Sequence, residues 1–341
     1  MDNTILLQSS DLAVGYKQSN GRTQLLHQDI NVQLNQGEFA CLLGPNGAGK
    51  STLIKTLSGF IPKISGDVCI NGLNLHDYKR GQLAKVVSVV LTEKLQVSNM
   101  TVFDLVALGR TPYTDFFGNL SATDKGLVLQ AINDVGLQGF ANRQLICMSD
   151  GERQKAMIAK ALVQDTPLII LDEPTAFLDL PSKIEIVQLL KKLAVNNNKG
   201  ILLSTHDLEL ALQLADKIWL LAQGRQLECG IPEDLVLSNS FKSFFEKEGV
   251  LFDNESGSFR VQKDQLKTIQ VIGEGVEYQW LCHALNRIGF QTTLVEGDYP
   301  SIKTVENANE AFVLNGVDGH DKQFKTIEEL LCEINIFLKS N

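Results

Sequence analysis

Hydrophobic residues near the start of the chain either alternate with polar residues or run continuously over strand lengths. Three such stretches, 12–16, 29–34 and 38–43, are separated by Asn-Gly and Gln-Gly turn signals and predict β-strands. After residue 43 the pattern changes to a glycine-rich loop and then to helical spacing over 50–58, with Gly59 placed to end the helix. The pattern therefore predicts a β-rich opening that leads through a loop into a helix.

Further along the chain, strands alternate with helices. The continuous apolar stretches 168–171 and 200–203 predict buried strands, and the helical stretches 181–195 and 207–215 follow them. Such βα alternation is typical of a parallel sheet. Between these parts, residues 101–164 predict an insert that is largely helical, with Thr101 and Ser121 as N-caps of two helices.

Beyond about residue 240 the chain has a second rhythm that predicts a small α/β domain. Its expected elements are a strand at 268–272, a helix at 278–288, strands at 291–295 and 311–314, and a helix at 325–338. We therefore expect one domain over 1–240, with a helical subdomain at about 92–165, and a second domain of undefined role over 241–341.

Length and charge agree with two folded domains and restrict the partners. The chain has 341 residues, 44% of them hydrophobic, and a net charge of −9. Residues 1–240 carry 21 basic and 24 acidic side chains, whereas 241–341 carry 10 and 16. A nucleic-acid or anionic-lipid partner would favour a positive surface, so the acidic balance argues against both.

Cysteine spacing and hydropathy indicate the compartment. The six cysteines are scattered without a C-x-x-C pair, which favours reduced thiols in a cytosolic protein over disulfides or a zinc site. The sequence contains neither a secretory signal nor an apolar run of 18 residues. Any membrane role is therefore expected to depend on a partner protein.

A glycine-rich loop carries the strongest chemical signal. Residues 44–51 fit the pattern G-x-x-x-x-G-K-[ST] between a predicted strand and a predicted helix. In such a loop, backbone N–H groups and the helix N-terminus bind phosphate, Lys50 neutralises the β and γ phosphates, and Ser51 binds magnesium. The predicted nucleotide-binding residues of this region are Gly44, Pro45, Asn46, Gly47, Ala48, Gly49, Lys50, Ser51 and Thr52.

Two carboxylates follow the predicted strand at 168–171. A buried strand rarely ends in adjacent acids without a nearby cation or substrate. Next to a phosphate loop, Asp172 is expected to hold magnesium through water and Glu173 to polarise the attacking water. Taken alone, the same pair is more simply explained as a solvated turn.

Another polar motif precedes the helix predicted from about residue 153 to 163. Ser149 and Glu152 fit the S-x-x-E capping box, so the simplest interpretation is a helix cap. Ser149 also precedes Asp172 by one helix and one strand. In this order the motifs resemble those of ATP-binding cassette (ABC) ATPases, whose signature S-G-G-Q/E is present as Ser149, Asp150, Gly151 and Glu152.

The resemblance covers roughly residues 4–240 and implies roles for further residues. Tyr16 matches the aromatic residue that stacks on adenine, Asp179 matches a loop that communicates across a dimer, and His206 matches the switch histidine that contacts the γ-phosphate. It implies catalysis by Glu173, His206 and Lys50, ATP as ligand, and a magnesium ion bound by Ser51, Asp172 and the residue at position 92. The nucleotide contacts implied outside the glycine-rich loop are Tyr16, Ser149, Gly151, Glu152 and Asp179.

Two residues depart from the family pattern. Thr92 stands where a glutamine normally senses magnesium and water, so its shorter hydroxyl is expected to act through a bridging water. Asp150 replaces the first glycine of the signature and brings a negative charge near the expected γ-phosphate, unless its side chain points away or caps the helix. We expect slower hydrolysis or altered coupling rather than inactivity.

The resemblance also implies an assembly. Two cassettes of the family pack head to tail, so the chain is expected to form a homodimer, or a heterodimer with another cassette protein. A separate integral-membrane permease and, indirectly, a periplasmic binding protein are implied, with the chain peripheral on the cytoplasmic face of the inner membrane. Residues 92–114, with apolar Val102, Phe103, Leu105 and Val106, are the candidate permease contact, the alternative being a helix packed in the core.

The cargo follows from resemblance alone. Residues 102–113 and 175–179 are similar to subunits of the group that imports iron-siderophore, haem and cobalamin. The sequence leaves two alternative functions: a soluble cassette ATPase acting on nucleic acid or ribosomes, and a weakly active regulatory cassette. The first usually has paired cassettes, coiled coils or basic arms, which this sequence lacks, and ATPase activity lost on Glu173→Gln would exclude the second.

Overall fold

The structure is a computed structural model and describes residues 4–17, 23–91, 99–115, 117–245, 250–253, 257–261, 267–297, 300–304, 312–317 and 320–340. The chain divides into two compact units, Met1–Arg260 and Val261–Asn341. The sequence pattern places this boundary near 240. Residues between 240 and 260 stay with the first unit because Phe241, Phe244 and Phe252 are buried in its core.

The first unit opens with an antiparallel sheet. Its order is β2-β1-β4-β5, and β1 pairs with both β2 and β4. The strands are β1 (Ile5–Lys17), β2 (Thr23–Asn35), β4 (Ser65–Ile70) and β5 (Leu73–Asn74). β1 and β2 are longer than the alternation of 12–16 and 29–34 predicts, because several of their added residues are polar and solvent-exposed.

A second sheet, of order β10-β9-β3-β8-β7-β6, forms the centre of the unit. All its neighbouring strands are parallel except β9 and β10. They are β3 (Phe39–Leu43), β6 (Val87–Val90), β7 (Leu168–Asp172), β8 (Gly200–Ser204), β9 (Lys217–Leu220) and β10 (Glu228–Gly230). The predicted parallel sheet is confirmed.

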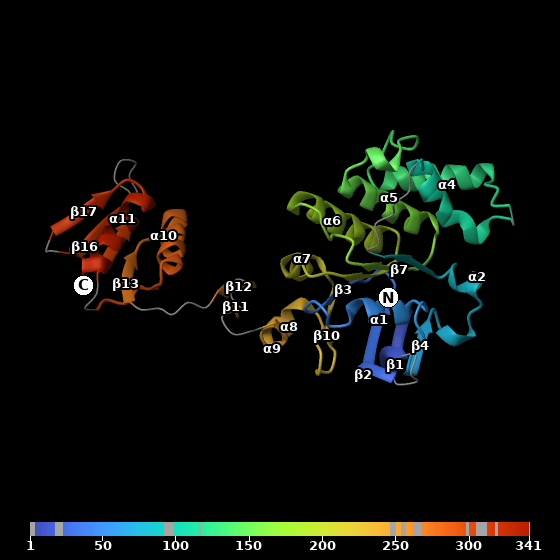
Figure 1. Cartoon of the computed structure of the whole chain (residues 1–341), viewed down its shortest axis with the longest axis horizontal. Coiled ribbons are helices and arrows are strands. Elements are labelled where there is room, and N and C mark those ends of the chain that lie inside the picture. Colours follow the sequence, from blue (N-terminus) through green and yellow to red (C-terminus); the bar gives the residue numbers. More distant parts are fainter. Residues whose placement is uncertain are drawn as a thin grey trace. The chain divides into compact units, whose positions relative to one another are not determined.

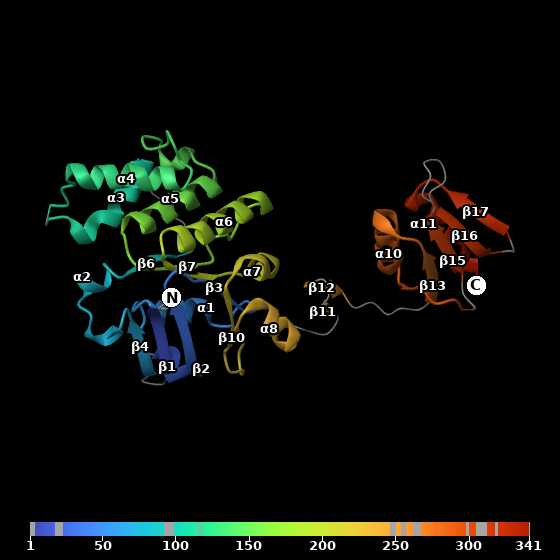
Figure 2. The ribbon, with the colours of Figure 1, turned by 180° about the vertical axis from the view of Figure 1, so that it is seen from behind.

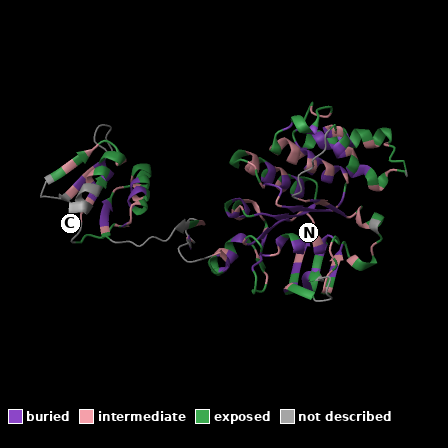
Figure 3. Ribbon diagram, in the orientation of Figure 1, coloured by how far each residue is buried: buried purple, intermediate pink, exposed green. Residues whose placement is uncertain are grey.

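The parallel strands at the centre of this sheet, β3, β7 and β8, are buried on both faces (Figure 3). On β3, Phe39, Cys41 and Leu43 join the hydrophobic core that also contains residues of α3, α4, α5 and α6, called the helix-side core. Ala40 and Leu42 join the second core, on the side of the antiparallel sheet. The alternation follows from the pleat of a strand, in which successive side chains point to opposite faces. It explains why the buried strands read as continuous apolar runs.

Helices complete the two layers around the central sheet. Figures 1 and 2 show α3, α4, α5 and α6 on one side of it and the antiparallel strands β1, β2 and β4 on the other. The helices are α1 (Lys50–Leu57), α2 (Arg80–Leu83), α3 (Val102–Ala107), α4 (Ala122–Asp134), α5 (Asp150–Val163), α6 (Leu180–Asn196) and α7 (Leu208–Leu214), with 3-10 turns η1 (Leu75–Asp77), η2 (Leu108–Tyr113) and η3 (Leu145–Cys147).

The predicted helix starts in the insert are confirmed. The side chain of Thr101 accepts the N–H of Asp104 and caps α3, and Ser121 accepts that of Asp124 and caps α4. In both cases the aspartate carboxylate accepts a hydrogen bond from the backbone N–H of the cap residue, which completes a capping box. Asp124 also accepts a hydrogen bond of 2.8 Å from Arg110 Nε, which joins η2 to α4.

Three of the four apolar residues of the candidate permease contact are packed inside the unit, and the fourth, Phe103, is half-buried against the same core. Val102, Leu105 and Val106 belong to the helix-side core and are at most 2% exposed. For them the structure supports the alternative of a helix packed in the core, because a buried side chain cannot meet a partner. Leu108 and Tyr113, on η2, remain 49% and 38% exposed. Residues 92–98 of the same segment lie outside the described residues.

The end of the first unit is joined to its core by aromatic packing. It comprises α8 (Pro232–Leu237), α9 (Ser240–Phe245) and a hairpin of β11 (Val250–Asp253) and β12 (Ser258–Val261). The rings of Phe241 and Phe252 stack with centroids 5.5 Å apart, and Phe259 meets Phe252 edge-on at 5.2 Å. These contacts attach the hairpin to α9.

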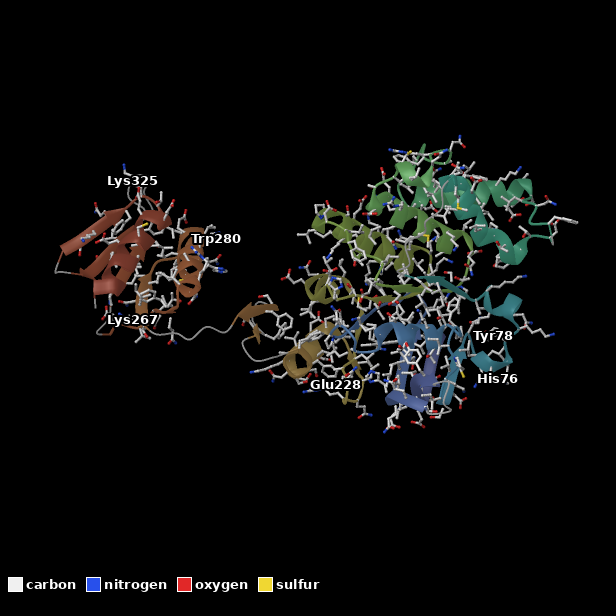
Figure 4. All side chains as sticks on the ribbon, in the orientation of Figure 1. His76, Tyr78, Glu228, Lys267, Trp280 and Lys325 are labelled. Atoms are coloured by element: carbon white, nitrogen blue, oxygen red, sulfur yellow. The ribbon has the colours of Figure 1, made fainter. Side chains whose placement is uncertain are left out.

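The second unit is a smaller α/β domain with its own core. Its sheet has the order β14-β13-β15-β16-β17 and mixes parallel and antiparallel pairs. Its elements are β13 (Lys267–Ile272), α10 (Gly275–Arg287), β14 (Phe290–Thr293), β15 (Ser301–Thr304), β16 (Phe312–Val317), β17 (His320–Phe324) and α11 (Ile327–Ser340). Trp280 on α10, labelled in Figure 4, is 63% exposed. Its ring centroid lies 5.6 Å from that of His283.

The α/β fold class expected from the sequence is confirmed for both parts. In the second unit the sequence missed β15 and β17, whose short segments are largely polar, and the predicted residue Ala311 lies outside the described residues. In the first unit it left further strands unpredicted, among them β6 and β9. Among the helices that the structure describes, none is long and apolar enough to cross a membrane.

Candidate functional site

The described part of the first unit contains a pocket with a volume of about 360 Å³. Most of its lining comes from the predicted nucleotide-binding loop, joined by one residue from each of β1 and β2 and by one acidic residue after β7. The lining residues are Tyr16, Leu26, Asn46, Gly47, Ala48, Gly49, Lys50, Ser51, Thr52 and Glu173. Of these, Leu26 alone was not predicted.

Glycines shape the loop between β3 and α1. A Cβ on Gly44 would lie 2.1 Å from the carbonyl oxygen of Leu221, so a larger residue cannot be placed there without moving the backbone. Gly47 and Gly49 have φ angles of 79° and 95°, which L side chains rarely adopt. Directly after Gly49, α1 begins and presents its N-terminus, a favourable place for phosphate.

Lys50 joins the loop to the acidic residue beyond β7. Its Nζ donates to the carbonyl oxygens of Gly44 at 2.8 Å and Pro45 at 3.3 Å and lies 3.6 Å from Glu173 Oε1. Its side chain is 5% exposed, against 26% for Glu173. A cation is thus held at the pocket wall, where it can neutralise phosphate charge.

The two predicted carboxylates differ in burial and share a partner. Asp172 is 3% exposed and accepts a 2.7 Å hydrogen bond from Ser204 Oγ at the end of β8. The same Oγ accepts the backbone N–H of Glu173 at 2.9 Å. Glu173 has a φ of 45°, so the chain turns sharply there. Ser204, at the carboxyl end of β8, therefore fixes both acids at the carboxyl end of the neighbouring strand β7.

The donors available around the loop fit magnesium. The hydroxyl of Ser51 and the carboxylate of Asp172 are hard oxygen ligands of the kind that Mg²⁺ takes together with phosphate oxygens and water. Among the described residues, no group of three or more His, Cys, Asp or Glu side chains forms a metal site by itself. Thr92 lies outside the described residues.

The predicted switch histidine follows β8 and is exposed to solvent. His206 precedes Asp207, whose carboxylate accepts Lys183 Nζ of α6 at 3.0 Å and Thr175 Oγ1 at 3.3 Å. The backbone N–H of Asp207 also donates to Thr205 Oγ1. The turn that carries His206 is therefore attached both to α6 and to the loop after Glu173.

Ser149 caps α5 as predicted. Its Oγ accepts the backbone N–H of Glu152 at 3.2 Å, and Glu152 Oε2 accepts the N–H of Ser149 at 2.8 Å. Asp150 pairs with the guanidinium of Arg153 one turn later. Its negative charge thus faces a cation on its own helix, and both side chains are exposed.

The start of α5 lies beside the start of α6. A Cβ added to Gly151 would lie 3.3 Å from Ser182 Oγ, and Ser182 belongs to the first turn of α6. Asp179 caps that helix, and hydrogen bonds from Ser182 hold the pKa of the Asp179 carboxyl below its usual range. The predicted residues missing from the pocket lining include these helix starts: Ser149, Gly151, Glu152 and Asp179.

Tyr16 contacts the phosphate-loop helix in this structure. Its ring is 43% exposed, and its hydroxyl lies 2.5 Å from Thr52 Oγ1 on α1. An exposed aromatic face at the mouth of a phosphate pocket offers a surface on which a base can stack. The geometry brings Tyr16 to the same pocket as Lys50.

Sequence reasoning missed several residues that position the site. Gln223 Nε2 donates to the carbonyl of Gly47 at 3.0 Å, His27 Nε2 lies 2.6 Å from that of Ala48, and Ser204 joins the two acids. Gln223 lies in the loop after β9, Ser204 at the end of β8 and His27 within β2, and none of them belongs to a motif with fixed spacing. Only the fold reveals that they meet the loop or the acids.

Comparisons with known proteins agree with this geometry. Residues 27–176 match the family model described as ABC transporter, and residues 266–335 match the one described as Iron ABC transporter C-terminal domain. The chain is 40% identical over 266 residues to an uncharacterized ABC transporter ATP-binding protein of Methanocaldococcus jannaschii, covering 78% of this chain and 90% of that protein.

Two further similarities extend the comparison. The chain is 32% identical over 240 residues to the iron(3+)-hydroxamate import ATP-binding protein of Bacillus subtilis, covering 70% of this chain and 87% of that protein. It also resembles the dimeric structure of a bacterial ABC transporter cassette, with a TM-score of 0.58 and 25% identity, over 67% of this chain and 99% of the other.

Proposed function

This chain belongs to the ABC transporter family as one of its ATP-binding subunits, and we propose that it powers the import of iron-siderophore complexes through a separate permease. One observation carries the mechanistic part of the proposal. The predicted nucleotide residues form two groups: the pocket around Lys50 and Glu173, and the helix starts at Ser149 and Asp179. The helix starts do not line the pocket of their own chain, and in the proposal a second copy brings them to it.

In the proposed dimer the copies pack head to tail. Ser149 and Gly151 of each copy would cover the ATP held by Gly44–Ser51 of the other, while Tyr16 stacks on the adenine. Phosphoryl transfer depends mainly on positioning and charge stabilisation, so a site closed from both sides should hydrolyse faster than an open one. The dimeric cassette structure to which this chain is similar supports the arrangement.

Each residue of the pocket has a role in the proposed hydrolysis. Lys50 neutralises the β and γ phosphates, and Glu173 polarises the attacking water, as its exposed position beside Lys50 allows. His206 contacts the γ-phosphate from the turn fixed by Asp207. A magnesium ion held by Ser51 and, through water, by Asp172 would neutralise the developing charge on the phosphates.

Coupling follows from the difference between the open and closed states. ATP binds the closed dimer better than the open one, and this difference in affinity draws the two attached permease subunits together. Hydrolysis removes the γ-phosphate and releases them. We place the chain on the cytoplasmic face of the inner membrane, attached through the permease, with a periplasmic binding protein delivering the cargo.

Two similarities support iron-siderophore complexes as cargo. The second unit matches a domain described for iron ABC transporters, and one relative of the first unit is named for iron(3+)-hydroxamate import. We propose that residues 241–341, most of which fold as the second unit, serve this iron-import class. Haem and cobalamin are the other cargoes of the group that the sequence resembles.

An uptake experiment tests the function. Cells lacking the gene would be complemented with wild-type protein or with Glu173→Gln, and uptake of ⁵⁵Fe-hydroxamate, haem and cyanocobalamin would be compared. We expect ⁵⁵Fe-hydroxamate uptake with the wild type alone. Equal uptake with both proteins would contradict the proposed motor, and uptake of haem or cobalamin instead would replace the proposed cargo.

A further inference from the structure

His27 lies behind the phosphate-binding loop, in the interior of the first unit. It is on β2, is 6% exposed, and its Nε2 is 2.6 Å from the carbonyl oxygen of Ala48. Leu26, its neighbour in sequence, lines the pocket, whereas His27 does not. On β1, the residue opposite His27 is Val14, which is fully buried. The imidazole therefore reaches the loop from the side away from the pocket.

The contact between His27 and Ala48 sets the orientation of one peptide group. A carbonyl oxygen accepts and cannot donate, so the bond requires a proton on His27 Nε2. In a trans peptide the C=O and the N–H point in opposite directions, and the described residues contain no cis peptide. With the Ala48 carbonyl turned toward His27, the N–H of Gly49 is turned toward the opposite side, where the pocket lies.

The imidazole also packs closely against Gly49. A Cβ on Gly49 would lie 3.2 Å from His27 Nε2 and 3.3 Å from its Cδ2. The loop is thus held at this point by a hydrogen bond and by contact with the ring. Since α1 begins directly after Gly49, the peptide that His27 orients stands at the helix N-terminus, where backbone N–H groups bind phosphate.

Other side chains hold three further carbonyls of the loop. Lys50 donates to Gly44 and Pro45, and Gln223 donates to Gly47. Among the side-chain hydrogen bonds of the described loop, His27 supplies the one to Ala48. The loop therefore relies on donors from three different elements, and each donor fixes a different peptide.

We propose that His27 is a positioning residue for phosphate binding: by donating Nε2–H to the Ala48 carbonyl, it aims the Gly49 N–H at the phosphates of the bound nucleotide. This inference rests on the proposed ATP-binding role of the pocket. It adds to that role a residue of the antiparallel sheet. The sheet then contributes to both ends of the site, through His27 to the phosphate end and through Tyr16 to the adenine end.

A matched pair of variants tests the proposal in the full-length protein. Gln and Met have similar length and volume, but only Gln carries an N–H donor, so His27→Gln keeps the hydrogen bond and His27→Met removes it. Equilibrium binding of ATP, ADP and adenosine would be measured, with thermal unfolding in the absence of nucleotide as the control for folding. We expect His27→Met to weaken ATP and ADP binding about fivefold, the usual value of one hydrogen bond.

The same experiment separates positioning from packing. We expect His27→Gln to bind ATP within about twofold of the wild type, and adenosine affinity to be the same in all three proteins, because the oriented peptide meets phosphate alone. Equal losses in both variants, or no loss in His27→Met, would overturn the role of His27 while leaving ATP binding intact. A wild-type protein that bound no ATP would contradict the proposed function as well.

A second measurement tests the proposal even if His27→Met does not fold. Long-range ¹H–¹⁵N spectra of the wild-type protein report which imidazole nitrogen carries the proton, and His27→Gln identifies the signals of His27 by their loss. We expect Nε2 to be protonated. A neutral ring protonated only at Nδ1 would overturn the proposal even if His27→Met failed to fold, because Nε2 could then donate nothing to Ala48.

Discussion

Lys50 Nζ and Glu173 Oε1 lie 3.6 Å apart at the wall of one pocket. The cation comes from the first residue of α1, which follows β3, and the carboxylate follows the last residue of β7, so the segments after these two strands supply opposite charges. Before nucleotide binds, each charge compensates the other. In the proposed mechanism a phosphate takes over the lysine, and Glu173 then orients the attacking water molecule.

Replacing Glu173 with glutamine should separate binding from hydrolysis. Glutamine keeps the size of the side chain but accepts a proton poorly, so we expect the turnover number for ATP to fall at least about 100-fold. ATP affinity should be retained or increased, since a negative charge beside the phosphates is removed. Lys50→Met is the control and should lose ATP binding. A turnover number within about twofold of the wild type would contradict the role of Glu173.

Ser149 should have two separable roles. Ser149→Ala removes the N-cap of α5 and should cost about 1 kcal/mol of unfolding free energy. Ser149→Asp keeps a good cap but presents a carboxylate to the partner's γ-phosphate, so stability should remain while ATPase activity is lost. Chemical denaturation and ATPase assays measure the two effects. Full activity in Ser149→Asp would show that Ser149 only caps its helix.

Asp150 should slow hydrolysis by its charge. Because it pairs with Arg153 on its own helix, its effect on the γ-phosphate is expected to be moderate, and Asp150→Gly should raise the turnover number a few-fold, about the effect of a screened surface charge. Arg153→Gln removes the compensating cation and should lower it. The stability of both variants should change by less than about 0.5 kcal/mol. A fall in turnover for Asp150→Gly would contradict this charge effect.

The position of the domain boundary predicts which shortened chain stays stable when the second unit is removed. A chain ending at residue 260 keeps Phe241, Phe244 and Phe252, which are at most 6% exposed. One ending at residue 240 loses all three and opens the helix-side core, at a cost of several kcal/mol, since loss of a buried phenylalanine costs about 3–5 kcal/mol. Thermal unfolding should therefore show a much lower midpoint for the shorter chain. Equal midpoints would contradict this packing.

Sequence motifs predicted the parts of the site that are continuous in the chain. The loop around Lys50, the cap at Ser149 and the apolar strand before Asp172 each depend on local geometry, which fixed spacing encodes. Ser204, Gln223 and His27 reach the site from distant segments, and no spacing rule connects them to it. Their roles depend on strand order, which pattern alone does not specify.

The same limit applies to two strands that the sequence missed in the second unit. β17 has polar residues on both of its faces and only one apolar residue, Phe324, and β15 has a single strongly apolar residue, Ile302. Such segments become strands because neighbouring strands pair with them rather than through their own pattern. Conversely, the apolar residues 102 to 106 were open to two interpretations, contact with a partner or core packing. Burial in three dimensions decides between them.

The mass of the Glu173→Gln protein in solution with magnesium and ATP tests the central claim most directly. Because this variant should bind ATP without hydrolysing it, light scattering after size-exclusion chromatography should report a dimer of the 37.6 kDa chain. The dimer should be absent without nucleotide and absent when Ser149→Asp is added. A monomer under saturating magnesium and ATP, or a dimer unaffected by Ser149→Asp, would contradict a site completed by the signature helix of a second copy.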